Sequence, residues 1–169
     1  MKRILLLATS ALVAAQSRST TPSQDRDFIE LCGAHLTLGL RQEAVLEDVA
    51  RQCNVNQVQD SRQWLLLTKE KPFRLFGAVD FTAGRLTRIQ RDWSAAAADA
   101  VDVAESLYFA GNRLLAEGHT TCVLETSEQG GLGFSIRRLS LKCGRKEIVV
   151  SSTRSKKHGD STDLMETLK

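Results

Sequence analysis

Proline is scarce in this sequence: Pro22 and Pro72 are the only two, so stiff linkers between domains are not expected. No Cys-x-x-Cys spacing occurs, which argues against a zinc site or a thioredoxin-type redox pair. The signatures Gly-x-Ser-x-Gly and His-Glu-x-x-His are absent, and the three histidines lie far apart along the chain. We therefore expect no catalytic residues, no metal and no cofactor, and we predict that the protein is not an enzyme.

The apolar run at the start of the chain is too short to span a bilayer. Two basic residues precede this run, which covers residues 4–15 and ends in Val-Ala-Ala, small residues of the kind that signal peptidase requires. The pattern predicts a signal peptide over residues 1–15 and a polar, flexible leader over residues 16–24. A buried N-terminal helix is the alternative, but it should carry polar residues at helical spacing. We expect export, so that the protein is periplasmic or secreted.

Composition favours one globular domain over residues 25–169, because 42% of the residues are hydrophobic and 25% are charged. We divide this domain into three parts: residues 36–93, residues 94–153 and a tail over residues 154–169. The formal net charge is +3, and it falls to 3 − 2 = +1 without the two basic residues of the signal peptide. That balance argues neither for nor against a polyanionic partner.

Two amphipathic helices are predicted. Val45 and Val49 share one face of the first helix, over residues 41–52. The second begins at the N-cap residue Ser94 and ends at Gly118, with a continuous stripe of apolar and small residues. Each helix must bury its stripe, and a sheet of the same chain is the expected partner. A coiled coil with another protein is the alternative for the second helix.

Short strands follow the first helix. Residues 64–67 form an apolar run, residues 75–81 alternate with the period of a strand, and residues 82–85 form a tight hairpin. The next strand changes parity, so we expect a β-bulge near Thr87 or Arg88. Residues 25–35 suit a short helix, with a strand as the alternative.

A second hairpin surrounds the turn Gly144-Arg145. The turn gives a register that places apolar residues on one face, pairing Cys143 with Lys146, Leu141 with Ile148 and Leu139 with Val150. Placing Cys122 opposite Cys143 brings Leu124 to Leu141 and Thr126 to Leu139, on that same face. This agreement predicts a Cys122–Cys143 disulfide, and residues 127–138 then become a flexible loop. By elimination, Cys32 and Cys53 form a second bridge.

The tail begins with polar and basic residues and is expected to end in a short helix from Asp160 or Ser161, docked through Leu164, Met165 and Leu168. Together these elements predict an α+β fold. Two helices pack on small antiparallel sheets, and the order α-β-β-β occurs approximately twice.

Basic residues gather in the second hairpin, at Arg137, Arg138, Lys142, Arg145 and Lys146. One interpretation is a surface that binds anionic ligands, and the other is the solvated face of an edge sheet. No aromatic residues are interleaved with them, which together with export argues against nucleic acid as a partner.

Two stretches resemble the SmpA/OmlA (BamE-like) domain. Residues 38–46 (LGLRQEAVL) look like the segment that opens its helix, and residues 79–89 (VDFTAGRLTRI) are similar to its strand hairpin; the likeness covers residues 36–93. It implies a small, non-enzymatic α+β module of the bacterial envelope. We therefore expect an exported interaction or scaffold module whose partner is a protein or an envelope component. The alternatives are an inhibitor of a secreted enzyme, acting through residues 127–134, and a polyanion-binding protein.

Overall fold

The computed structural model describes residues 27–93, 103–119 and 121–169, which form ten strands and two helices. The expected signal peptide, the leader and the N-cap residue Ser94 lie outside these residues. In the described part of the chain, neither helix has the length and apolar character that crossing a membrane requires.

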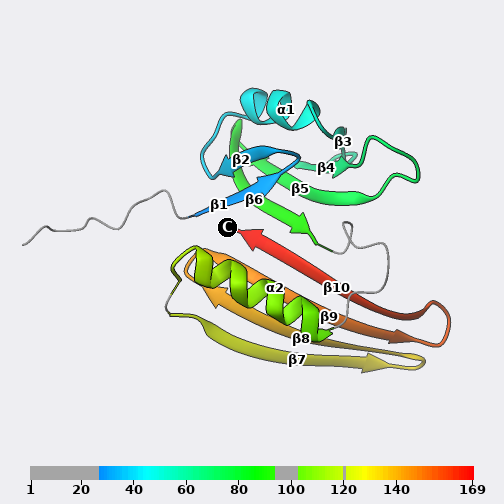
Figure 1. Cartoon of the computed structure of the whole chain (residues 1–169). Coiled ribbons are helices and arrows are strands. Elements are labelled where there is room, and N and C mark those ends of the chain that lie inside the picture. The colour runs from blue at the N-terminus through cyan, green and yellow to red at the C-terminus, as the bar shows by residue number, and fades with distance from the viewer. Residues whose placement is uncertain (1–26, 94–102, 120) are drawn as a thin grey trace, which may run out of the picture.

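Eight strands form one antiparallel sheet in the order β3-β4-β5-β6-β10-β9-β8-β7 (Figure 1). In that order they are β3 (Asn54–Gln57), β4 (Gln63–Leu67), β5 (Leu75–Thr82), β6 (Arg85–Asp92), β10 (Gly159–Leu168), β9 (Lys146–Ser155), β8 (Phe134–Cys143) and β7 (Val123–Gly131). A separate hairpin consists of β1 (Phe28–Leu31) and β2 (Ala34–Thr37), and the helices are α1 (Gln42–Ala50) and α2 (Val103–Ala116). Each half of the large sheet is thus a meander of four strands, and the halves meet where β6 pairs with β10.

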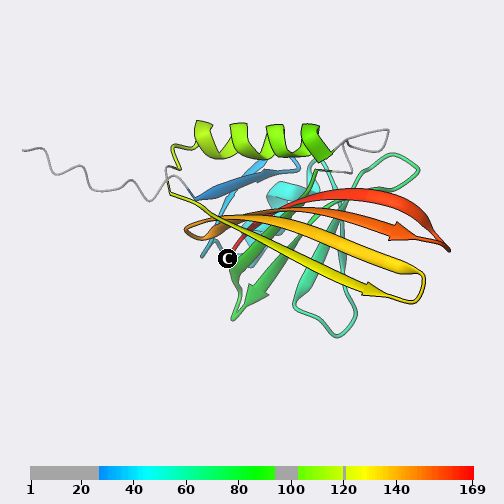
Figure 2. The ribbon, with the colours of Figure 1, turned by 90° about the horizontal axis from the view of Figure 1, so that it is seen from below.

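Both helices and the β1–β2 hairpin lie on the same face of the large sheet (Figures 1 and 2). Successive side chains of a strand point to opposite faces, so β10 directs Leu164 and Leu168 toward the helices and Asp163 and Met165 away from them. We call the first the helix-covered face and the second the open face.

Two apolar clusters fill the helix-covered face. In the larger one, Val45 and Val49 of α1 and the β1–β2 hairpin pack on β4, β5 and β6. In the smaller one, Leu114 of α2 packs with Ile148 and Val150 of β9. Each fully buried aliphatic side chain contributes roughly 1.5–3 kcal/mol to folding. The predicted apolar face of α1 is confirmed by Val45 and Val49. In α2, Leu114 is buried, but Tyr108 and Leu115 of the predicted stripe are 67% and 73% exposed.

Helix α2 ends in a Schellman motif. Gly118 has φ +74°, its N–H donates to the Leu115 carbonyl at 3.0 Å, and the His119 N–H donates to the Leu114 carbonyl at 3.1 Å. The predicted end of the helix at Gly118 is confirmed.

Three local predictions for the strands are confirmed. The β8–β9 register pairs Leu141 with Ile148, as the turn at Gly144-Arg145 predicts, and the β7–β8 register pairs Leu124 with Leu141, as the placement of Cys122 opposite Cys143 predicts. In the β5–β6 hairpin Asp80 pairs with Arg88 and Phe81 pairs with Leu86, which leaves Thr87 as the extra residue of the expected bulge. Two disulfides are present, Cys32–Cys53 and Cys122–Cys143, and they indicate folding in an oxidising compartment.

The predicted α+β class is wrong, because the described residues are mostly strand and one of the two helices is short. Residues 127–138 do not form a loop. Strand β7 continues to Gly131, β8 starts at Phe134, and only Leu132-Gly133 forms the turn. Every residue added to such a hairpin gains backbone hydrogen bonds to its neighbour, and the polar side chains stay in water.

The tail is strand β10 and not a helix. Its apolar residues fit either structure, but β6 and β9 offer it hydrogen-bonding partners on both sides. Near the start of the described chain, the expected short helix is also wrong. Residues 28–37 form a hairpin whose turn residues Cys32 and Gly33 have φ values of 53° and 70°, which is the alternative strand interpretation.

Candidate functional site: the open face of the sheet

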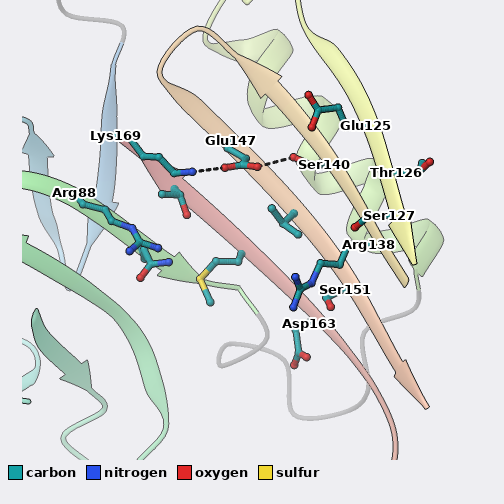
Figure 3. A pocket seen from close by; sticks show the side chains of 14 residues that line it. Arg88, Glu125, Thr126, Ser127, Arg138, Ser140, Glu147, Ser151, Asp163 and Lys169 are labelled. Atoms are coloured by element: carbon teal, nitrogen blue, oxygen red, sulfur yellow. Dashed lines mark hydrogen bonds and ion pairs between the residues drawn. The ribbon is translucent and has the colours of Figure 1, made fainter. Parts of the chain in front are cut away.

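The open face is hollowed between β6 and β7 over a volume of about 560 Å³ (Figure 3). Five neighbouring strands supply its side chains, and Lys169 closes one end. Most of these side chains are polar, and Val149 and Met165 are half-buried apolar residues among them. The hollow is therefore a concave surface built by side chains from far apart in the sequence.

The strand register arranges the side chains of the hollow in straight rows across the sheet. One row runs Ser127–Arg138–Ser151–Asp163, and the next runs Glu125–Ser140–Val149–Met165. Neighbouring members of a row lie about 4.8 Å apart at the backbone, the usual spacing of strands. A molecule lying on this face therefore meets regularly spaced hydroxyl, charged and apolar groups.

One end of the hollow carries a connected set of polar contacts. Lys169 Nζ lies 2.7 Å from Glu147 Oε2, and the Ser140 hydroxyl donates to Glu147 Oε1 at 2.7 Å (Figure 3). The hydrogen bond from Lys169, strengthened by that from Ser140, lowers the pKa of the Glu147 carboxyl below its ordinary value. Glu147 is thus an ionised, fixed acceptor at this end of the hollow.

The other end of the hollow carries charges that are not used internally. Among the described residues, Arg138 and Asp163 make no hydrogen bond or ion pair through their side chains. Ser151 lies between them in the register, so their backbones are two strand spacings apart. Partial burial, with the nearby Asp92 carboxylate, raises the pKa of Asp163. This cation and this carboxyl are available to a bound molecule.

The structure separates the five basic residues that the sequence analysis grouped. Arg138 and Lys142 belong to the open face, where Lys142 contacts Glu125. Arg137 points the other way and pairs with Glu128, and Arg145 donates from the turn to the Lys169 carbonyl. Lys146 is fully buried on the helix-covered face. Alternation along β8 is the physical reason, because adjacent basic residues of a strand cannot share a face.

Lys146 belongs to a buried ionic cluster that the sequence analysis missed. Its ammonium group donates to Glu117 Oε2 at 2.6 Å and to the Phe28 carbonyl at 2.9 Å, and it lies 3.0 Å from Glu166 Oε1. The indole N–H of Trp93 donates to Glu166 Oε2 at 3.2 Å. A signal was available, because the predicted register already placed Lys146 on the same face as Ile148. The cluster ties α2 and β1 to the sheet.

The histidines do not converge. His35 stacks on the Phe28 ring with centroids 3.8 Å apart, and His119 Nε2 lies 3.5 Å from Glu117 Oε2. Within residues 27–93, 103–119 and 121–169, no three histidine, cysteine, aspartate or glutamate residues are placed to hold a metal ion.

Comparison with known proteins finds no match to a family model, to a curated protein or to a solved structure. The resemblance of residues 36–93 to the SmpA/OmlA domain therefore stays a prediction. The geometry of the open face is what remains to argue function from.

Proposed function

We propose that this protein is an exported, non-enzymatic binding module that holds a protein partner against the open face of its large sheet. The observation that carries the proposal is the one-sided arrangement of the fold. Both helices and the β1–β2 hairpin cover one face, and the hollow of about 560 Å³ lies on the other. Export, to the periplasm or the exterior, rests on the signal-like start of the chain together with the two disulfides.

Three properties of the hollow favour a protein over other ligands. Its lining comes from five strands, so it matches a broad surface rather than one small molecule. Charges of both signs lie in one row, with Arg138 two strands from Asp163. The half-buried Val149 and Met165 occupy the adjacent row and supply an apolar centre of the kind found in protein interfaces. A polyanion site would instead need its basic residues on one face.

The proposal is tested by capture from an envelope extract followed by titration of the purified partner. Met165→Arg places a long cation at the centre of the hollow, and we expect it to weaken binding at least tenfold, which corresponds to about 1.4 kcal/mol. Tyr108→Arg is the matched control, because Tyr108 is 67% exposed on α2, and this helix lies on the side of the sheet away from the hollow (Figure 2). The proposal fails if no partner is recovered reproducibly, or if both variants bind like the wild type.

A second candidate function, inhibition of a secreted enzyme, is favoured by the tip of the β7–β8 hairpin. Leu132 is fully exposed at this tip and Phe134 beside it is 41% exposed, so the hairpin presents an apolar point that an enzyme cleft can accept. A panel of envelope hydrolases assayed with the wild type and with Leu132→Asp tests it. Inhibition that the substitution abolishes supports this function, and no inhibition across the panel removes it.

A further inference from the structure

Strand β7 forms a long edge of the large sheet without a partner on its outer side. It is the last strand in the sheet order, all nine of its residues are exposed, and no other described strand pairs with it (Figure 1). The opposite edge differs, because β3 has only four residues. A short edge strand offers little backbone for pairing, whereas a long one offers a row of free N–H and C=O groups.

Proline, lysine and β-bulges, which often protect an edge strand, are missing from β7. Its sequence, VLETSEQGG, contains neither proline nor lysine, and its pairing with β8 runs from Val123 to Gly131 without a bulge. Its two acids are neutralised from β8, since Glu125 contacts Lys142 and Glu128 lies 3.1 Å from Arg137. The edge is therefore extended, and its charge is internally compensated.

We propose that two copies of this protein associate by antiparallel pairing of their β7 strands, which joins the two large sheets into one. The register that pairs the whole strand places Ser127 on the two-fold axis. It sets Val123 opposite Gly131, Leu124 opposite Gly130, Glu125 opposite Gln129 and Thr126 opposite Glu128. No two charges of the same sign face each other, and the glycines leave room for the two apolar side chains. The contact is isologous and uses one edge per copy, so assembly stops at the dimer.

The pairing also covers exposed apolar side chains and brings the hollows of the two copies next to each other. Val123 is 58% exposed and Leu124 is 59% exposed in the single chain, and the pairing places both against the second copy. Glu125 and Ser127 line the hollow, so the hollows of the two copies become neighbours across the axis, on the same side of the joined sheet.

Sedimentation over a concentration series, with the full mature chain and intact disulfides, measures the association. We expect the wild type to double its molar mass as concentration rises. Ser127→Asp/Gln129→Glu sets acid against acid at residue 127 and at both 125–129 contacts, and we expect the dissociation constant of the dimer to rise at least tenfold. The carboxylate introduced at position 127 faces Arg138 within its own chain, so the monomer should stay folded. Asn56→Asp/Gln59→Glu, with Asn56 in β3 and Gln59 in the turn that follows it, is the matched control and should dimerise like the wild type.

Disulfide trapping tests the register itself. Directly opposed residues have Cβ atoms about 4.5–5.5 Å apart, so Ser127→Cys should link two copies under mild oxidation, whereas Gln129→Cys alone should not. A mixture of Glu125→Cys and Gln129→Cys should link. A wild type that stays monomeric at every concentration overturns the proposal, as does a dimer that the β7 variant leaves intact or that links Gln129→Cys as readily as Ser127→Cys. The test of the dimer uses variants of β7, and the test of partner binding uses Met165→Arg, which does not change β7. Either proposal can therefore fail without the other.

Discussion

Lys146 Nζ lies 2.6 Å from Glu117 Oε2, and their side chains are 0% and 6% exposed. Glu166 lies 3.0 Å away on the adjacent strand, and the Phe28 carbonyl accepts a further hydrogen bond. The ammonium group thus donates two hydrogen bonds, to Glu117 and to Phe28, and has Glu166 as a second ionic partner. Glu117 directly follows α2, Phe28 belongs to β1 and Glu166 to β10, so one lysine links these three elements on the helix-covered face.

Replacing the buried Lys146 should lower the free energy of unfolding far more than replacing the exposed Arg137. Lys146→Met removes the cation that two buried carboxylates share, although Glu117 keeps Arg113 at 2.7 Å and Glu166 keeps the hydrogen bond from Trp93. We expect a loss of about 3 kcal/mol in the free energy of unfolding, the lower end of the range for a broken buried pair. Arg137→Met breaks an ion pair whose members are 64% and 60% exposed, so its loss should stay below about 1 kcal/mol. Urea denaturation of both variants measures the two losses in the free energy of unfolding. Equal losses would contradict the buried ionic cluster around Lys146.

The two disulfides should stabilise the fold by similar amounts through loop closure. Both join cysteines separated by 21 positions, for which the loss of unfolded-chain entropy corresponds to about 3 kcal/mol. We expect Cys122→Ala/Cys143→Ala and Cys32→Ala/Cys53→Ala each to lower the free energy of unfolding by about that amount. Denaturation of the oxidised variants checks this, and a variant as stable as the wild type would show that its bridge is not formed.

Asp163 should destabilise the fold at neutral pH. Burial and the Asp92 carboxylate raise its pKa in the folded state, so folding disfavours the ionised form. The protonated Asp163 carboxyl contributes fully to the free energy of unfolding at pH values below its pKa in the unfolded chain. This contribution is lost as the pH rises through its pKa in the folded protein. We expect Asp163→Asn to raise the melting temperature at pH 7 and to leave it nearly unchanged at pH 3. Melting curves across this range measure the effect, and a gain of the same size at both pH values would exclude titration of this carboxyl as its cause.

Two glycines of the α2 region should respond oppositely to alanine. Gly118 has φ +74°, where a side chain is strained, so Gly118→Ala should destabilise the protein by about 1 kcal/mol. Gly111 lies inside the helix, and a Cβ there meets no atom within 4 Å. Gly111→Ala should therefore stabilise the protein by roughly 0.5–1 kcal/mol. Chemical denaturation of both variants checks the signs, and a loss at Gly111 would mean that its space is filled.

The parts of the fold that depend on residues close together in the sequence could be predicted from it. The turn at Gly144-Arg145 determines the β8–β9 register, and the change of parity after Leu86 predicts the bulge at Thr87. The Cys122–Cys143 bridge follows from the same register, because Cys122 directly precedes β7 and Cys143 ends β8.

The candidate site could not be predicted in this way. Arg138, Ser151 and Asp163 are far apart in sequence and carry no motif, and only the order β8-β9-β10 places them in one row. Lys146 looked like part of a basic surface because its acids, Glu117 and Glu166, come from distant elements.

The turns at residues 82–85 and 144–145, the buried face of α1, the β8–β9 register and the cysteine pairs follow from the amino-acid sequence, because they depend on backbone preferences and on the alternation of side chains. The central position of strand β10, the placement of both helices on one face and the edge position of β7 became known from the fold alone. A strand obtains its hydrogen bonds from other strands, so its place in a sheet depends on residues far away in the chain.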